Sequence, residues 1–285
     1  MSDHRAPDHH PNPIATSLIR HEPGVPAIRN VNFPGMFALY MKEVRRFLKV
    51  QLQTIWAPAL TTLLFLVIFT VALGRGGLMV MGVSFADFVA PGLIIMGMVQ
   101  NSFQNATTGL LVGKVQGTIV DYLMPPLSAG ELLFAMVAAS VTRAVFVGGA
   151  VWAAMLLWPG VNVVPQHLWA VIWFGLSGAA MLGFMGILTA MWADKFDHAA
   201  AVGNFVVAPL SLLSGTFYSM EHVAPVFRSI SHANPFFYAI SGFRYGFLGQ
   251  ADSAIALGVA VTLGLNLLLA LICYRALKKG WKIKA

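Results

Sequence analysis

The chain has 285 residues, of which 58% are hydrophobic and only 10% are charged, whereas soluble domains are roughly 45–50% apolar and about 25% charged. This composition excludes an ordinary soluble globule, and the membrane-crossing segments leave no room for a second catalytic domain of about 100 residues. The net charge of +7 comes without a block of Lys and Arg interleaved with aromatic residues, so it indicates membrane topology and no nucleic-acid partner. The single cysteine, Cys273, excludes an intrachain disulfide and a metal cluster built on cysteines.

The N-terminal part of the chain has two sections. Residues 1–32 are rich in Pro and His and contain no apolar run, which predicts a disordered cytoplasmic tail. Residues 33–53 repeat apolar side chains at helical steps, with basic side chains on other faces, and this pattern predicts an amphipathic interfacial helix whose basic face meets anionic headgroups. The apolar set is Phe37, Tyr40, Met41, Val44, Phe47 and Leu48, and the basic set is Lys42, Arg45, Arg46 and Lys49.

Six apolar segments follow, at 54–73, 86–112, 131–157, 167–192, 199–218 and 254–274. Each is long enough to cross about 30 Å of hydrocarbon as a helix. The first begins too late for a cleaved signal peptide, so we expect a retained span. With the N-terminus inside, most of the 18 Lys and Arg residues fall in cytoplasmic pieces, which predicts that both termini are cytoplasmic. We therefore predict an all-α membrane protein with a six-span domain over 54–285.

Polar residues inside two of the predicted spans need hydrogen-bond partners from protein or water, because lipid tails cannot supply them. The second span carries Gln100, Asn101, Gln104 and Asn105, which either brace neighbouring helices or form the polar wall of a solute path. Arg143 in the third span reaches an interface, pairs with another subunit or lines a path. The fourth span contains small residues that permit close helix approach, namely Gly175, Gly178, Gly183 and Gly186.

Two loops have structure of their own. In the inner loop, residues 118–123 can form a short helix that Pro125 and Pro126 stop, which suits docking of a cytosolic partner. On the other side of the membrane, residues 219–253 repeat phenylalanines at helical steps after Asn234-Pro235. This pattern predicts short helices in the outer leaflet.

The sequence contains no recognisable motif for binding a nucleotide or for catalysis. The nearest match to a phosphate-binding loop, residues 109–115, has one residue too few between its glycines and lacks the Ser or Thr after Lys114. No nucleophile–base or paired-carboxylate arrangement appears, and we predict no enzyme activity. The cluster Asp194, Lys195, Asp197 and His198 reads as a solvated turn with no metal.

At this point the sequence resembles the ABC-2 family of exporter permeases, the membrane halves of ATP-binding-cassette exporters of drugs, lipids and polysaccharides. The resemblance covers roughly Phe33 to the C-terminus. Its most specific motifs are Phe196-Asp197, Pro209-Leu210, Ser214 to Ser219, Asn234-Pro235, Tyr238 and Gly242 to Gly246 in the family's order and spacing, and Asp121 to Leu123 with Pro126 in the inner loop. Gly117 and Val120 depart from the pattern, since many relatives carry charged residues there, and this affects the details of partner selectivity.

The resemblance implies that the interfacial helix is an elbow helix, that the inner-loop helix is a coupling helix, and that the outer helices are re-entrant. It further implies a homodimer of permeases in membrane lipid with two separate ATPase subunits, which bind the ATP and Mg²⁺, so that this chain has no cofactor of its own. The residues expected to couple to the partner ATPase are Gln116, Thr118, Asp121, Tyr122, Leu123, Pro126, Lys42 and Arg45. The residues expected to line the path or to support it are Gln100, Asn101, Gln104, Asn105, Arg143, Phe217, Tyr218, Phe243 and Arg244.

The functional hypothesis is therefore the permease subunit of an exporter in the inner (cytoplasmic) membrane. Its solute is amphipathic: a drug, a lipid or a glycan-linked lipid. An ion-coupled secondary transporter and a membrane scaffold that moves nothing remain as alternatives. The first would need intramembrane acids or a repeated half with interrupted helices, and neither is clear in the sequence.

Overall fold

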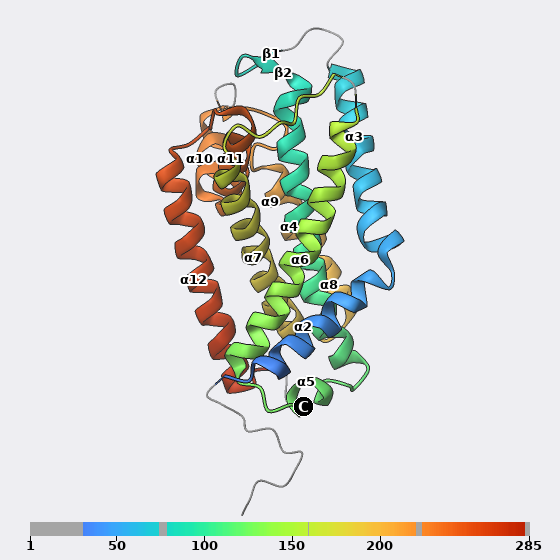
Figure 1. The fold of residues 1–285 in the computed structure, drawn as a ribbon. Helices are drawn as coiled ribbons and strands as arrows, with labels where there is room; N and C mark the ends of the chain where they lie inside the picture. Colours follow the sequence, from blue (N-terminus) through green and yellow to red (C-terminus); the bar gives the residue numbers. More distant parts are fainter. Residues whose placement is uncertain (1–30, 74–78, 159, 221–223, 283–285) are drawn as a thin grey trace, which may run out of the picture. The chain divides into compact units, whose positions relative to one another are not determined.

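The computed structural model describes residues 31–73, 79–158, 160–220 and 224–282, which are mainly helical (Figure 1). The predicted tail lies almost entirely outside the described residues. In chain order the elements are α2 (Phe33–Leu48), the π-helical turn η1 (Leu52–Trp56), α3 (Ala57–Leu73), β1 (Met79–Val80), β2 (Val83–Ser84), α4 (Phe85–Val115), α5 (Val120–Leu123), α6 (Ala129–Leu156), α7 (Leu168–Trp192), α8 (Phe196–Val202), the π-helical turn η3 (Gly203–Val207), α9 (Ala208–Leu212), α10 (Pro225–Ala233), α11 (Pro235–Leu248) and α12 (Ile255–Lys279). The strands β1 and β2 pair antiparallel, with Met79 opposite Ser84.

Helix α4 lies at the centre of the bundle, against α7 and α6 (Figure 1). Ser84 caps its first turn by accepting a hydrogen bond from the backbone N–H of Asp87. Close contact with α7 depends on glycine, since a Cβ added to Gly186 would lie 2.6 Å from the carbonyl oxygen of Phe103. The approach predicted for the four glycines of this span is confirmed, because a Cβ on each would lie 3.3 Å or less from an atom of a neighbouring helix.

Within the described residues, four helical stretches are long and apolar enough to cross a membrane: Leu52–Val71, Ala129–Leu156, Leu168–Trp192 and Ile255–Lys279. Each overlaps a predicted span. Helix α4 has 31 residues, but its polar C-terminal half lowers its mean hydropathy. The segment predicted as a span at 199–218 contains three consecutive short elements, α8, η3 and α9, and its helix ends at Leu212. The prediction of a regular helix to residue 218 is therefore wrong, because Gly215 takes a left-handed φ of +75° in the turn that follows.

Both π-helical turns lie just before a proline inside a helical run. In η1 the backbone N–H of Ala57 reaches back to the carbonyl of Leu52, one residue before Pro58. In η3 the backbone N–H of Ala208 reaches the carbonyl of Gly203, one residue before Pro209. A proline lacks the donor that would continue a regular helix and its ring crowds the preceding turn, so a widened turn absorbs the irregularity.

Helix α2 crosses one end of the bundle, which we call the lower end after its place in Figure 1, and packs against α6. Its buried side chains are Leu39, Glu43, Val44 and Phe47. Of the predicted apolar stripe, Val44 and Phe47 point inward, whereas Phe37 and Leu48 are exposed. The helix also ends at Leu48, earlier than the predicted residue 53, because a turn separates it from η1.

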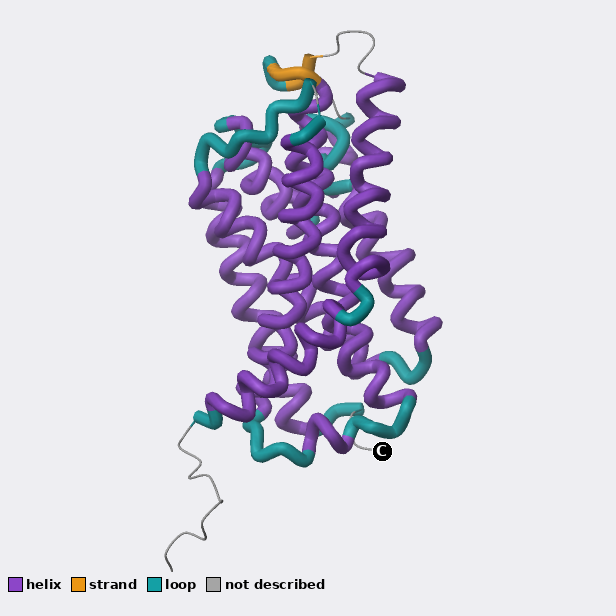
Figure 2. Tube along the Cα trace, turned by 45° about the vertical axis from the view of Figure 1, so that its right-hand side comes forward, coloured by secondary structure: helices purple, strands orange, loops and turns teal. Residues whose placement is uncertain are grey.

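At the opposite, upper end, α11 packs against α7, α12 and α4. Its N-cap is Asn234, whose side chain accepts a hydrogen bond from the backbone N–H of Phe236, and Gly249 ends the helix in the left-handed conformation. Helices α10 and α11 fall within the stretch where the sequence predicted short outer helices. The tube in Figure 2 shows helices running between the two ends, with most of the loops near the ends.

Candidate functional site

The first candidate site is a junction at the lower end, where α5 meets α2 and the C-terminal part of α4. Gly117, with a φ of +71°, turns the chain back after α4. Tyr122 then packs on α4 so closely that a Cβ added to Gly113 would lie 3.2 Å from the tyrosine ring. Its hydroxyl donates to Oε1 of Glu43 at 2.8 Å and lies 3.2 Å from the carbonyl oxygen of Gly109. A single buried hydroxyl therefore joins three helices.

Glu43 is the ionisable group at the centre of this junction, and it is 2% exposed. Its Oε2 lies 2.8 Å from Nη2 of Arg46, one turn later on α2. Arg46 in turn donates to the carbonyl oxygen of Asn105 on α4 at 3.0 Å. Burial, and secondarily the neighbouring carboxylate of Glu43, raise the pKa of Tyr122, so the hydroxyl stays protonated and able to donate.

The hydrogen bonds continue from the junction into the bundle. Asn105 donates from Nδ2 to the hydroxyl of Ser140 on α6 at 3.3 Å. One turn further along α4, Asn101 accepts a hydrogen bond of 2.9 Å from Nη2 of Arg143. We call Glu43, Arg46, Asn105 and Tyr122 the junction cluster. Its hydrogen bonds and ion pair connect the short helix α5, by way of α2, to Asn105 in the C-terminal half of α4.

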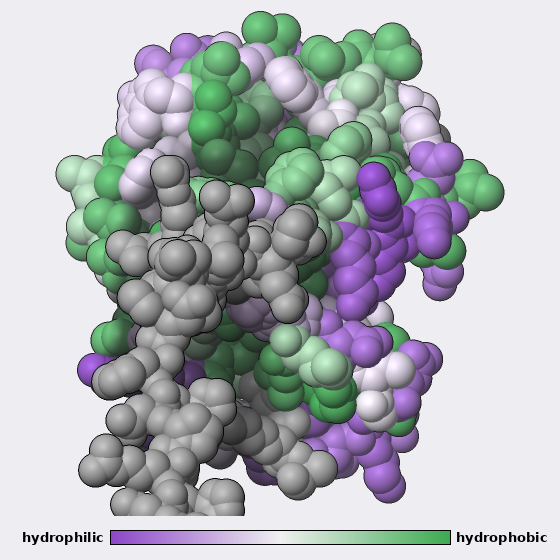
Figure 3. Space-filling view, turned by 60° about the horizontal axis from the view of Figure 1, so that its bottom comes forward, coloured by the Kyte–Doolittle hydropathy of each residue, from purple (hydrophilic) through white to green (hydrophobic). Residues whose placement is uncertain are grey.

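Most of the residues predicted to couple to a partner ATPase lie on the surface of this junction. Gln116, Thr118, Asp121, Leu123 and Pro126 are exposed, and so are Lys42 and Arg45 on α2. Tyr122 is the buried member of the predicted set. The ammonium nitrogen of Lys42 lies 3.8 Å from the centre of the Tyr122 ring, a cation–π contact that joins the exposed and buried groups. In Figure 3, which looks at this end, hydrophilic side chains gather on one side around smaller apolar areas.

Lys114, in the last turn of α4, holds the C-terminal end of α7 in place. Its ammonium group donates to the carbonyl oxygens of Ala190, Met191 and Ala193 at 3.3, 2.8 and 2.7 Å. These are the C-terminal carbonyls that a helix leaves without partners, where a cation is favourable. A carboxylate oxygen of Asp194 lies 3.7 Å from the same ammonium nitrogen and supplies an opposite charge.

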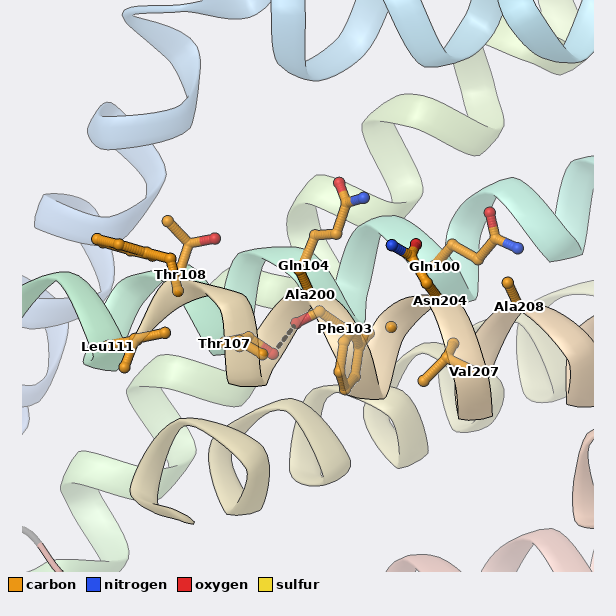
Figure 4. Close-up of a pocket in the computed structure, with 13 residues that line it drawn as sticks. Gln100, Phe103, Gln104, Thr107, Thr108, Leu111, Ala200, Asn204, Val207 and Ala208 are labelled. Carbon is orange, nitrogen blue, oxygen red and sulfur yellow. Dashed lines mark hydrogen bonds between the residues drawn. The ribbon is translucent and has the colours of Figure 1, made fainter. Parts of the chain in front are cut away.

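The second candidate site is a groove between α4 and the segment formed by α8 and η3, with a volume of about 390 Å³. Its polar side chains from α4 are Gln100, Gln104, Thr107 and Thr108, and Asn204 of η3 faces them. Figure 4 shows the amides of Gln100, Gln104 and Asn204 extending to one side, while Phe103 and Thr107 lie toward η3. The remaining lining residues are Leu111, Phe196, Ala199, Ala200, Gly203, Val207 and Ala208.

The structure divides the predicted path residues of the second and third spans into two groups. Gln100 and Gln104 line the groove. Asn101, Asn105 and Arg143 are buried and bond to one another's helices, as described above. The buried face of α4 therefore braces neighbouring helices, which was one of the two readings that the sequence left open, whereas the other face of the same helix lines the groove.

The predicted residues near the upper end hold a loop in place. Tyr218 donates to the carbonyl oxygen of Leu213 at 2.9 Å, and the Phe217 ring lies 4.6 Å from that of Phe69 on α3. Phe243 is buried between α11 and its neighbours. These three side chains lie outside the groove between α4 and η3, whose lining residues do not include them.

Arg244 forms a buried ion pair with Asp252, and both side chains are 1% exposed. The Nη1–Oδ2 distance is 2.7 Å. Arg244 also donates from Nη2 to the carbonyl oxygen of Gly215 and stacks over the Phe88 ring at 3.9 Å. The second carboxylate oxygen of Asp252 accepts from the backbone N–H of Met220 at 3.1 Å. This pair therefore ties α11, the loop after α9 and the approach to α12 into one unit.

Sequence reasoning missed four residues that these sites depend on: Glu43, Lys114, Asn204 and Asp252. Glu43 carried a usable signal, because an acid within the apolar stripe of an amphipathic helix needs a buried partner. Asn204 faces residues of α4 that are distant in the chain, and Asp252 meets Arg244, eight residues earlier, across the turn after α11 and not at a helical step, so no helical pattern marked either residue. Among the described residues, no group of three or more His, Cys, Asp or Glu side chains lies close enough to hold a metal ion.

The fold and these sites define a helical membrane protein with a polar junction at one end and a groove beside its central helix. Comparison with known proteins makes the class specific. The model of the ABC-2 type transporter family matches residues 35–248, and the chain belongs to this family. It is a transporter permease, and among its described residues four helices are long and apolar enough to cross a membrane.

Individual relatives agree with this assignment. The chain is 32% identical over 244 residues to the inner membrane transport permease YadH of Escherichia coli (strain K12), which covers 85% of this chain and 94% of that protein. It is 28% identical over 210 residues to nodulation protein J of Rhizobium leguminosarum bv. viciae, covering 68% of this chain and 76% of that protein. A similar protein J from Neorhizobium galegae is 26% identical over 198 residues, with 67% and 74% covered.

Proposed function

We propose that this chain is the permease subunit of an ABC exporter, which forms the path of an amphipathic solute while a separate subunit hydrolyses ATP. The observation that carries the proposal is the junction cluster. It links an exposed helix, α5, to the central helix α4 by way of α2, through the 2.8 Å hydrogen bond from Tyr122 to Glu43 and the 3.0 Å hydrogen bond from Arg46 to the carbonyl oxygen of Asn105. A rigid polar link of this kind moves the two helices together, which is what transmission of a partner's motion requires.

In this proposal the domain has six spans: α3 with η1, then α4, α6, α7, the α8–η3–α9 segment, and α12. Helix α2 is the elbow helix, α5 is the coupling helix, and α10 and α11 are re-entrant helices on the outer side. The 31-residue length of α4 supports counting it as a span, because about 20 residues suffice to cross the hydrocarbon. The glutamines on its surface then lie at membrane depth, where only protein or water can satisfy them.

The lower end faces the cytoplasm in this proposal, together with both termini. The support is the number of basic residues at that end: Lys42, Arg45, Arg46, Lys49 and Lys114 beside the junction, and Arg275, Lys278 and Lys279 in the last turns of α12. Cytoplasmic loops carry an excess of Lys and Arg. The chain works as a homodimer in membrane lipid, and ATP and Mg²⁺ bind to the ATPase partner, so this chain needs no cofactor of its own.

The proposed transport cycle uses these contacts to carry motion from the partner to the permease. Closure of the two ATPase subunits pushes α5, and Tyr122 carries this displacement to Glu43 on α2. Arg46 and Asn105 pass it to α4, whose other face lines the groove. The permease performs no bond chemistry. It binds the solute differently in the two arrangements of its helices, and ATP hydrolysis in the partner biases these arrangements.

The first test is affinity purification of the tagged chain in mild detergent, followed by mass spectrometry and an assay of vanadate-sensitive ATP hydrolysis. We expect a phosphate-loop ATPase to be recovered, with turnover that vanadate inhibits and solute stimulates. A permease that purifies alone, even with the candidate ATPase co-expressed, would overturn the proposal in favour of a scaffold or a secondary transporter. Transport that protonophores abolish would indicate the secondary transporter.

A further inference from the structure

The polar residues of α4 separate into two stripes that differ in how they are satisfied. Asn101 and Asn105 are one turn apart on the buried side, and both have hydrogen-bond partners. Gln100, Gln104 and Thr108 are also spaced by one turn each, on the side that faces the groove. We call these three residues the groove stripe.

The side chains of the groove stripe have no hydrogen-bond partner within the part of the chain that the structure describes. The side chains of Gln100, Gln104, Thr108 and the facing Asn204 form no hydrogen bond there, although each lines a groove beside a helix of 31 residues. Figure 4 shows the three amides extending to the same side of α4. Amide groups without a hydrogen-bond partner at membrane depth are unfavourable, so water or a bound molecule must satisfy them.

The chemistry of the groove selects the class of molecule that would satisfy them. Side-chain amides both donate and accept hydrogen bonds, so they match hydroxyl and amide groups, which do the same. None of the residues that line the groove carries a charge. A phosphate or an ammonium group would lose its hydration there without an opposite charge to replace it. Phe103, Phe196 and Leu111 add apolar surface, which suits the faces of a ring or an adjoining alkyl chain.

We propose that the groove stripe, with Asn204, binds an uncharged polyhydroxylated or amide-bearing group of the transported solute, such as a sugar unit. This inference rests on the proposed function, because it takes the groove as part of the solute path. It narrows the solute from any amphipathic molecule to one whose polar part is neutral. The volume of about 390 Å³ falls within the range of roughly 300–1,000 Å³ that small-molecule sites occupy.

The test uses the fact that the chain has one cysteine, Cys273, which is buried. In a Cys273→Ser background, Ala200→Cys places a reporter thiol on the exposed wall of the groove opposite the stripe. The full chain, with any co-purified ATPase, is placed in lipid nanodiscs, and the rate of maleimide labelling is measured. The probes are octyl glucoside, octyl phosphate and octylammonium, each below its micellar concentration, so that only the headgroup differs.

We expect octyl glucoside to slow labelling saturably, and the two charged probes at the same concentration to leave the rate unchanged. Gln104→Leu should raise the half-protecting concentration of octyl glucoside about fivefold, as expected for one lost hydrogen bond. Gln53→Leu, at an exposed glutamine outside the groove, serves as the matched control and should leave that concentration unchanged.

Three results would overturn the proposal. Equal protection by all three probes would indicate binding through the alkyl chain, and protection by none would indicate that the groove binds no such group. A reporter thiol that forms a disulfide with a second copy and resists labelling without a probe would make the groove an interface between copies. Recovery of the ATPase from the same preparations reports separately on the proposed function, so the two failures are distinguishable.

Discussion

The hydroxyl of Tyr122 lies 2.8 Å from a carboxylate oxygen of Glu43, which stands 79 residues earlier in the chain. This contact joins α5, a helix of four residues, to α2. A helix this short has no stability of its own, because a single turn does not repay the cost of nucleation. Its position therefore depends on Tyr122, and whatever moves α5 also acts on Glu43.

Tyr122→Phe should weaken the junction without removing the ring that packs on Gly113. The carboxylate of Glu43 keeps Arg46 but loses a buried donor, which costs about 1–3 kcal/mol. We expect a lower free energy of unfolding in mixed micelles and less ATP hydrolysis stimulated by solute in the assembled complex. Tyr274→Phe, at an exposed tyrosine of α12, is the control. Equal effects of the two substitutions would contradict a specific role for Tyr122.

Glu43→Gln and Arg46→Met test whether the ion pair acts as a unit. Glu43 is buried while the Arg46 side chain is 30% exposed, so solvent screens the pair in part and each single change should cost about 1–3 kcal/mol. The double variant should cost less than the sum of the two, because it leaves no uncompensated charge. Unfolding of all four proteins under the same conditions gives the interaction energy. Strict additivity would show that the two charges do not stabilise each other.

The sequence predicted the positions of the helices better than their contacts. The fourth span was expected at 167–192, and the corresponding helix is Leu168–Trp192. The agreement is close because turn residues on both sides of a long apolar run mark where the helix begins and ends. The end of the fifth segment could not be predicted equally well. Gly215 and the π-helical turn before Pro209 interrupt it through backbone geometry that hydropathy does not report.

The sequence predicted which residues belong to the candidate sites, but not which face of a helix each residue lies on. Gln100 and Asn101 are neighbours with similar chemistry, yet one lines the groove and the other bonds to Arg143. Which of them points inward depends on where α6 and η3 lie around α4, and this follows from packing between distant segments. Asp252 was missed for a different reason: it lies only eight residues after Arg244, but the two side chains meet because the chain turns back after the end of α11, which hydropathy does not report.

Exchanging the charges of Arg244 and Asp252 should not restore what either single substitution loses. Asp252→Asn leaves a buried guanidinium unpaired, which costs about 3–5 kcal/mol. In the double exchange Arg244→Asp with Asp252→Arg, the carboxylate at 244 would face the carbonyl of Gly215 and the Phe88 ring, which match only a cation. Expression and thermal unfolding in detergent measure the effect. Recovery of wild-type stability by the exchange would mean that the ion pair alone matters there.

Gly186→Ala tests the close approach of α7 to α4, and the chain supplies its own control. The new Cβ would lie 2.6 Å from the carbonyl oxygen of Phe103 and 2.8 Å from the Cβ of Ala106, so the backbones must separate. Because the carbonyl is part of a rigid helix, we expect the free energy of unfolding to fall by about 1–3 kcal/mol, as for overpacking in a protein core.

At Gly149 on α6 an added Cβ meets nothing within 4 Å. Gly149→Ala should therefore be neutral or should stabilise the helix by up to about 1 kcal/mol, since alanine has the higher helix propensity. Thermal unfolding of both variants in the same detergent separates the two effects. If Gly186→Ala were as stable as Gly149→Ala, the contact between α4 and α7 would be looser than these distances indicate, and the groove beside α4 would not have a fixed wall.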